Sequence, residues 1–163
     1  MVPVSRDPVT AYVAIGANLG DALQTVLRAF DALALLPDTR VTGRSRLYRT
    51  APHEAQGPDF VNAVAQIETR LTAPGLLDAL QALENQAGRQ RPYLNAPRTL
   101  DLDLLFYGQA RMDSARLTLP HPRWRERAFV LYPLADLLPD QVSAEDRGRV
   151  SGQVIDVLPE AKS

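Results

Sequence analysis

A short segment near the middle of the chain alternates strictly between apolar and acidic residues: Leu100-Asp101-Leu102-Asp103-Leu104. This alternation predicts a β-strand from about Thr99 to Phe106, with both carboxylates on one face and the leucines on the other. Like charges two residues apart on one face repel each other unless they are solvated or share a cation. Because Mg²⁺ is held by one or two carboxylates with phosphate oxygens and water, the pattern predicts either a metal site or a solvated strand face.

The other hydrophobic patterns predict further strands and helices before and after this strand. Strands are predicted at 9–15, 41–50 and 60–69, and helices at 21–36, capped by Asp21, and at 74–88. With the strand at 99–106, the order is β-α-β-β-α-β, the ferredoxin-like arrangement. That order predicts an α+β fold with a mainly antiparallel sheet and helices packed on one face. A hairpin segment (116–119), a helix at 124–138 and a short closing helix at 151–158 predict a C-terminal helical extension.

Charge is distributed unevenly along the chain. The net charge is −1, yet residues 89–127 contain eight arginines and four acids, a local excess of +4. A confined basic cluster indicates a local anion site or a solvated basic face, whereas nucleic-acid binders tend to be basic overall. The only lysine is Lys162, which excludes a phosphate-binding loop of the GxxxxGK[ST] type. Arginine forks and a metal ion would therefore have to hold any nucleotide.

Four further segments carry candidate binding residues, each with a plain structural alternative. The arginine-containing loop 89–97 would close over a polyphosphate or move freely in solvent. The turn at 16–21 would bind an anion at a helix N-terminus or be a tight turn. His121 would donate to a phosphate or be structural. Phe60 and Asn62 would stack on and hydrogen-bond to a flat heterocycle, or belong to the core and a turn.

Taken in order, these segments resemble the 6-hydroxymethyl-7,8-dihydropterin pyrophosphokinase family of folate biosynthesis (2-amino-4-hydroxy-6-hydroxymethyldihydropteridine diphosphokinase). The resemblance covers about residues 10–140. Its markers are the runs AYVAIGANLG (11–20), YRT (48–50), DFVNA (59–63), LPHP (119–122) and, most specific, PRTLDLD (97–103). It implies transfer of the diphosphate of ATP to the hydroxymethyl group of the pterin, with AMP as the second product.

The resemblance also assigns roles to individual positions. It implies two Mg²⁺ ions held by Asp101 and Asp103, which with Arg91 and Arg98 form the catalytic set. For ATP it implies the positions Gln81, Glu84, Arg91, Arg98, Leu104, Arg116, Thr118, His121 and Arg127. For the pterin it implies Thr50, Ala51, Pro52, His53, Phe60, Asn62 and Phe129, with Phe60 and Phe129 on either side of the ring. Loops at 17–20, 51–59 and 89–97 are expected to close on the substrates.

The chain departs from the family pattern at a few positions. Asn95 and Ala96 stand where many relatives have tryptophan and glycine, Ala51 replaces a frequent proline, and His53 replaces a frequent leucine. The rival interpretation is a non-catalytic ferredoxin-like module that binds a ligand or RNA; among enzymes, a nucleotidyl transferase would also use paired aspartates.

Composition completes the expectations. The absence of cysteine excludes disulfides and thiolate chemistry, and no apolar run is long enough to cross a membrane. We therefore expect a single pyrophosphokinase domain over residues 1–163, cytoplasmic and monomeric, with small-molecule substrates and neither a nucleic acid nor a membrane as partner.

Overall fold

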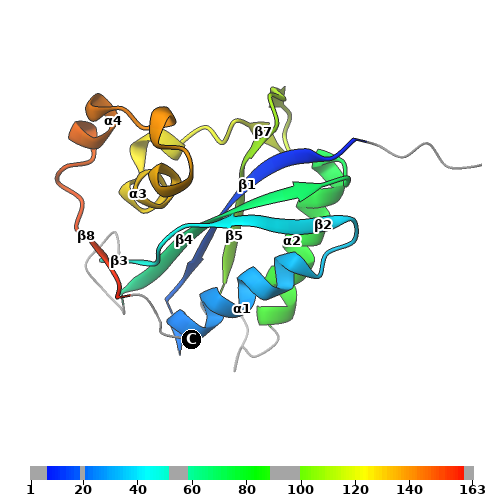
Figure 1. Cartoon of the computed structure of the whole chain (residues 1–163), viewed down its shortest axis with the longest axis horizontal. Coiled ribbons are helices and arrows are strands. Elements are labelled where there is room, and N and C mark those ends of the chain that lie inside the picture. Colours follow the sequence, from blue (N-terminus) through cyan, green and yellow to red (C-terminus); the bar gives the residue numbers. More distant parts are fainter. Residues whose placement is uncertain (1–6, 19–20, 52–58, 89–99, 160–163) are drawn as a thin grey trace, which may run out of the picture.

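The structure is a computed structural model that describes residues 7–18, 21–51, 59–88 and 100–159. Its centre is an antiparallel sheet with the strand order β5-β1-β4-β3-β8, in which β2 also pairs with β4 (Figure 1). The strands of this sheet are β1 (Val9–Ala17), β2 (Thr39–Arg44), β3 (Tyr48–Thr50), β4 (Phe60–Thr69), β5 (Asp101–Tyr107) and β8 (Ile155–Val157). A small separate hairpin pairs β6 (Met112–Asp113) with β7 (Thr118–Leu119).

Helices cover both faces of the sheet. They are α1 (Ala22–Ala34), α2 (Ala73–Gly88), α3 (Ala128–Leu137) and α4 (Ala144–Arg149), with short 3-10 turns η1 (Trp124–Glu126) and η2 (Pro139–Gln141) before and after α3. Figure 1 shows α1 and α2 on one side of the sheet and α3 on the other. Within the described part of the chain, no helix combines the length and apolar character needed to cross a bilayer.

Alternate residues of the central strand β1 belong to two different cores. Val13 and Ile15 pack with Phe30 of α1 on one face, whereas Tyr12 and Ala14 pack against α3 on the other. Each large apolar side chain that is fully buried in this way contributes about 1.5–3 kcal/mol. The expectation that the helices lie on one face holds for α1 and α2 only, because the C-terminal extension supplies a second layer.

The predicted β-α-β-β-α-β order is confirmed, and β4 has the predicted bounds 60–69. The predicted second strand is divided in two at Ser45, which is buried. There the Ser45 hydroxyl accepts a hydrogen bond from the Val64 amide at 2.8 Å, so a side chain replaces one rung of the ladder. The helix predicted at 124–138 is likewise divided, into η1 and α3 at Arg127.

The closing helix predicted at 151–158 is wrong. Residues 155–157 form β8, which pairs antiparallel with β3 so that Ile155 lies opposite Thr50. The β-branched residues Val154, Ile155 and Val157 favour an extended backbone, and the free edge of β3 supplies the hydrogen-bond partners. The local residues thus favour a strand, but its partner β3 lies about a hundred residues earlier in the chain, where no local pattern indicates it.

Strand β5 carries the two aspartates on the face that α3 covers. Leu102 and Leu104 lie in the core beneath the opposite face, as predicted. The register against β1 shifts between Leu104 and Phe106, so Leu105 is an extra residue, and its side chain belongs to the core on the α3 side. The face that presents the carboxylates is therefore apolar at its other end.

One half-buried acid fixes α3 to the sheet. Asp136 of α3 accepts hydrogen bonds from the Arg46 backbone amide at 3.0 Å, the Arg46 guanidinium at 2.9 Å and the Tyr48 hydroxyl at 2.9 Å. Burial by itself raises the pKa of Asp136, but the bonds from Arg46 and Tyr48 outweigh it and hold that pKa below its usual value. The junction of β2 and β3 is thereby joined to the middle of the C-terminal layer.

This cluster predicts a loss of stability at high pH. Burial, and after it the hydrogen bond to Asp136, raises the pKa of Tyr48 to about 12. The value in an unfolded chain is about 10, so neutral Tyr48 stabilises the fold fully below that pH, and the contribution disappears as the pH rises towards 12. Replacement by Tyr48→Phe is expected to lower the free energy of unfolding by about 1–2 kcal/mol near pH 8.

The measurement is denaturant unfolding of both proteins near pH 8 and near pH 11. Because only the wild type has the hydroxyl to ionise, the difference in unfolding free energy between the two proteins should shrink at the higher pH. A difference that stays constant or widens would show that the Tyr48 hydroxyl is not stabilised in its neutral form.

Candidate active site

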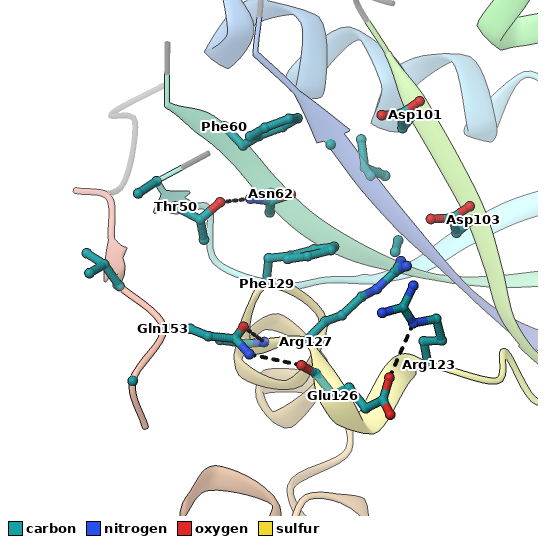
Figure 2. A pocket seen from close by; sticks show the side chains of 17 residues that line it. Thr50, Phe60, Asn62, Asp101, Asp103, Arg123, Glu126, Arg127, Phe129 and Gln153 are labelled. Atoms are coloured by element: carbon teal, nitrogen blue, oxygen red, sulfur yellow. Dashed lines mark hydrogen bonds and ion pairs between the residues drawn. The ribbon is translucent and has the colours of Figure 1, made fainter. Parts of the chain in front are cut away.

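A cleft of about 640 Å³ lies between the end of the sheet and the N-terminal end of α3. This volume is in the range of small-molecule sites in proteins. Eight residues that the sequence analysis singled out line the cleft: Thr50, Ala51, Phe60, Asn62, Asp101, Asp103, Arg127 and Phe129. Figure 2 shows the carboxylates at one side of it and two phenylalanine rings at the other.

The carboxylate side is built by β5 and β1 together. Asp101 lies opposite Gly16 and Asp103 opposite Ala14 in the antiparallel register. Since Gly16 and Ala14 have almost no side chain, space is left beside the aspartates, and both carboxylates line the cleft. Asp101 is exposed and Asp103 is half-buried. The prediction that both acids lie on one strand face, with the leucines on the other, is confirmed.

Whether Asp101 and Asp103 suit Mg²⁺ depends on which other ligands are available to the ion. Among the described residues, no group of three or more acidic, histidine or cysteine side chains forms a complete metal cage. Mg²⁺ does not need one, because it usually keeps water and phosphate oxygens as most of its ligands and takes one or two carboxylates from the protein. The donor set of Asp101 and Asp103 therefore suits a metal that arrives with a polyphosphate.

Cationic side chains reach the cleft from η1 and the start of α3. Figure 2 shows Arg123 and Arg127 extending towards the side that carries Asp103. The Arg123 Nε atom lies 3.2 Å from the Glu126 carboxylate, and the Arg127 guanidinium carbon lies 5.5 Å from the centre of the Phe129 ring. Arg127 is thus positioned between the acidic and the aromatic ends of the cleft.

His121 lies in the same electrostatic environment but does not line the cleft itself. Burial lowers the pKa of His121; Asp103 acts against this, and Arg127 and Arg123 lower the pKa further. The neutral ring is therefore favoured. Its Nδ1 atom accepts a hydrogen bond from the Arg123 amide at 3.2 Å, so the ring hydrogen is on Nε2, where it can be donated.

The other end of the cleft is an aromatic slot. Phe60 of β4 and Phe129 of α3 lie on opposite sides of a space, with Asn62 and Thr50 between them at its base (Figure 2). The Asn62 amide nitrogen donates to the Thr50 hydroxyl at 2.7 Å, and both residues are buried. Two rings with a polar pair between them are suited to a flat heterocycle that both donates and accepts hydrogen bonds.

Gly16 keeps this polar pair accessible. A Cβ atom at position 16 would lie 3.0 Å from the Asn62 Oδ1 atom, closer than side chains normally approach. A larger residue there would push the amide away from Thr50. The sequence predicted that Gly16 ends the strand and begins a turn, but the structure places it inside β1. There its missing side chain allows the Asn62 side chain to come close.

Besides His121, five other predicted nucleotide positions lie outside the cleft lining. Glu84 of α2 accepts a hydrogen bond from the Leu102 amide at 2.9 Å, and Arg116 forms an ion pair with Asp78. The Leu104 side chain is buried in the core on the opposite face of the sheet. Gln81 is exposed on α2, and Thr118 is half-buried on β7.

Four predicted site residues lie outside the described part of the chain: Arg91, Arg98, Pro52 and His53. The same holds for Asn95 and Ala96, and for most of the loops expected to close. Conversely, the cleft includes residues that the sequence analysis did not assign. Arg123 was counted only within the basic cluster, and Glu126 and Gln153 had no role. Gln153 comes from a segment whose position depends on a strand pairing that no local pattern reveals.

Comparison with known proteins finds relatives of similar sequence over most of the chain. The sequence model of the family described as 7,8-dihydro-6-hydroxymethylpterin-pyrophosphokinase (HPPK) matches residues 12–139. A 2-amino-4-hydroxy-6-hydroxymethyldihydropteridine pyrophosphokinase of Pseudomonas aeruginosa is 49% identical over 130 residues, covering 79% of this chain and 80% of the relative. The protein of the same name from Haemophilus influenzae is 42% identical over 135 residues, covering 82% of this chain and 84% of the relative.

Solved structures extend the likeness to the fold. A Plasmodium falciparum HPPK-DHPS structure superimposes with a TM-score of 0.65 at 12% identity over 84% of this chain. The match covers 43% of that longer protein. The rival interpretation, a non-catalytic ligand- or RNA-binding module, is not favoured, because these relatives bear the name of a pyrophosphokinase, which is an enzyme. On its sequence, the chain belongs to the 7,8-dihydro-6-hydroxymethylpterin-pyrophosphokinase family.

Proposed function

We propose that this pyrophosphokinase transfers the β,γ-diphosphate of Mg²⁺-bound ATP to 6-hydroxymethyl-7,8-dihydropterin within the cleft described above. The hydroxymethyl oxygen forms a bond to the β-phosphorus, the bond from that phosphorus to the bridging oxygen of the α-phosphate breaks, and AMP leaves. The hydroxyl proton is released. The observation that supports this best is that one cleft joins paired carboxylates to an aromatic slot.

In this proposal the aromatic slot holds the pterin. Phe60 and Phe129 stack on the two faces of the ring, and the buried Asn62–Thr50 pair offers hydrogen-bonding groups to its edge. The substrate's hydroxymethyl arm then extends towards the carboxylates. Holding the two reactants in line in this way supplies a large part of the acceleration in phosphoryl transfer.

At the other end, Asp101 and Asp103 would hold two Mg²⁺ ions that arrive with the triphosphate. Bound there, the metal would neutralise phosphate oxygens and lower the pKa of the attacking hydroxyl. The chain's own part is orientation. Arg127, which lies beside Phe129, would contact a phosphate oxygen, and neutral His121, just outside the cleft lining, would donate a hydrogen bond from Nε2 to the triphosphate. Arg91 and Arg98 are proposed to complete the catalytic set.

Other parts of the proposal rest on resemblance or composition alone. Contacts of ATP with Gln81, Glu84, Leu104, Arg116 and Thr118, and of the pterin with Ala51, Pro52 and His53, remain predictions. So do a single working domain, a monomeric state and a cytoplasmic location. The direct test of the reaction is incubation with ATP, Mg²⁺ and the pterin alcohol. AMP and a pterin diphosphate are expected; incorporation of AMP into the product would indicate a nucleotidyl transferase instead.

The metal assignment predicts that Asp101→Asn and Asp103→Asn each lower kcat by about 100-fold or more, because each removes a charge that the metal requires. The fold should be unchanged, since both side chains face the cleft. Steady-state kinetics at saturating Mg²⁺ and circular dichroism provide the measurements. Asp113→Asn, an exposed acid on the β6–β7 hairpin, is the matched control. Near-normal turnover by either cleft variant would refute the assignment.

The slot assignment predicts a selective loss of pterin affinity. Removing one stacking ring with Phe60→Ala should weaken pterin binding about tenfold, since stacking of a heterocycle on an aromatic side chain contributes about 1–3 kcal/mol. Phe60→Tyr keeps the ring and should bind within about threefold of the wild type. Calorimetry with the pterin and, separately, with an ATP analogue and Mg²⁺ distinguishes the ligands. Equal weakening of both would argue against a dedicated pterin slot.

A further inference from the structure

The last part of the described chain forms one wall of the cleft. The family match ends at residue 139, yet Gly152, Gln153 and Val154 line the same space as Thr50 and Phe129. Figure 2 shows Gln153 beneath Phe129 and beside the turn that carries Glu126. The residues that follow η2 therefore contribute to a site that the matched region alone would leave open on this side.

Gln153 makes two hydrogen bonds across the start of α3. Its Oε1 atom accepts from the Ala128 amide at 2.8 Å, and its Nε2 atom donates to the Glu126 carbonyl at 2.9 Å. The first residues of a helix have backbone N–H groups without a partner inside the helix. Here the N-cap residue, Arg127, makes no side-chain capping bond. Gln153 supplies a cap from 25 residues further along the chain.

The segment that presents Gln153 is itself firmly held. The Gln153 amide donates to the Val150 carbonyl at 2.9 Å, and the Leu158 amide donates to the Leu47 carbonyl at 2.8 Å. Between these points β8 pairs with β3, with Ile155 opposite Thr50. The Gln153 side chain therefore connects the segment that pairs with Thr50, at the base of the slot, to the start of α3, which carries the Phe129 wall.

A second contact joins the same C-terminal part to η1. The carboxylate of Asp146 in α4 is almost fully buried and lies 3.2 Å from the Arg125 guanidinium and 2.9 Å from that of Arg149. Burial raises the pKa of Asp146, but the Ser143 amide and the arginines outweigh it, so that its pKa lies below its usual value. Ionised Asp146 therefore holds η1 through Arg125, and Gln153 holds the turn that follows at Ala128.

We propose that Gln153 is a positioning residue for the pterin slot. By fixing the amide of Ala128, it sets the backbone of the adjacent Phe129, whose ring forms one wall of the slot. Arg127 is affected less, because its long side chain can adjust to a small backbone shift. This inference rests on the proposed function, in which the slot between Phe60 and Phe129 holds the pterin.

The test compares Gln153→Ala with the wild type and with Gln141→Ala, an exposed glutamine of η2 outside the cleft. Loss of two hydrogen bonds to the backbone is expected to raise KM for the pterin about tenfold. KM for ATP should stay within about twofold, and kcat should fall less than KM rises. Amide hydrogen exchange at Ala128 should become about tenfold faster. Gln141→Ala should change none of these quantities.

Each other outcome counts against a specific statement. A lower kcat with an unchanged pterin KM would mean that Gln153 only stabilises the fold, and would overturn the positioning role. Unchanged exchange at Ala128 would overturn the cap. If the wild type itself neither binds the pterin nor forms its diphosphate, the proposed function fails, and hydrogen exchange still decides whether Gln153 holds α3.

Discussion

The structure depends on the burial of β1 on both faces. One face, through Val13 and Ile15, completes the core with α1 and α2. On the other face, side-chain size falls steadily from Tyr12 through Ala14 to Gly16. Tyr12 is covered by the α3 layer, while Ala14 and Gly16 form part of the cleft floor. The small side chains at positions 14 and 16 leave space beside the α3 layer, and the cleft occupies that space.

The same decrease in side-chain size along β1 explains why the aspartates and the phenylalanine rings line one cleft. The neighbours of β1 are β5 and β4, so residues opposite Gly16 face the cleft from both sides. Asp101 is its partner on β5, and Asn62 is its partner on β4. A single position without a side chain thus separates a carboxylate from a carboxamide. A ligand lying over Gly16 can contact a charged group at one end and a neutral hydrogen-bonding group at the other.

Local sequence patterns predicted the parts of the fold that depend on local physics. The alternation at 100–104 gave the correct face for Asp101 and Asp103, and Asp21 does cap α1, accepting a hydrogen bond from the Gln24 amide at 3.1 Å. In contrast, the break at Ser45 depends on a hydroxyl reaching a neighbouring strand. Side-chain rungs of this kind have no periodicity, so hydrophobic patterning predicts one continuous strand instead.

Parts of the site were unpredictable for a related reason. Phe60 and Asn62 were candidates from their own chemistry and the family resemblance added Phe129. Gln153 lies in no motif and reaches the cleft only through the pairing of β8 with β3. The second helical layer could not be predicted for a similar reason: its attachment at Asp136 uses Arg46, 90 residues earlier in the chain. Contacts over such separations are properties of the folded chain and not of any window of residues.

The pairing of β8 with β3 also affects how readily copies of this protein can associate through the edges of their sheets. Without β8, the outer edge of β3 would present unpaired amides and carbonyls, a surface on which strands of other chains can add and begin aggregation. β8 covers that edge with only three residues, and the middle one, Asp156, is exposed and charged. A short strand with a central charge is a poor template for further strands. The sheet therefore ends in a strand that discourages its own extension.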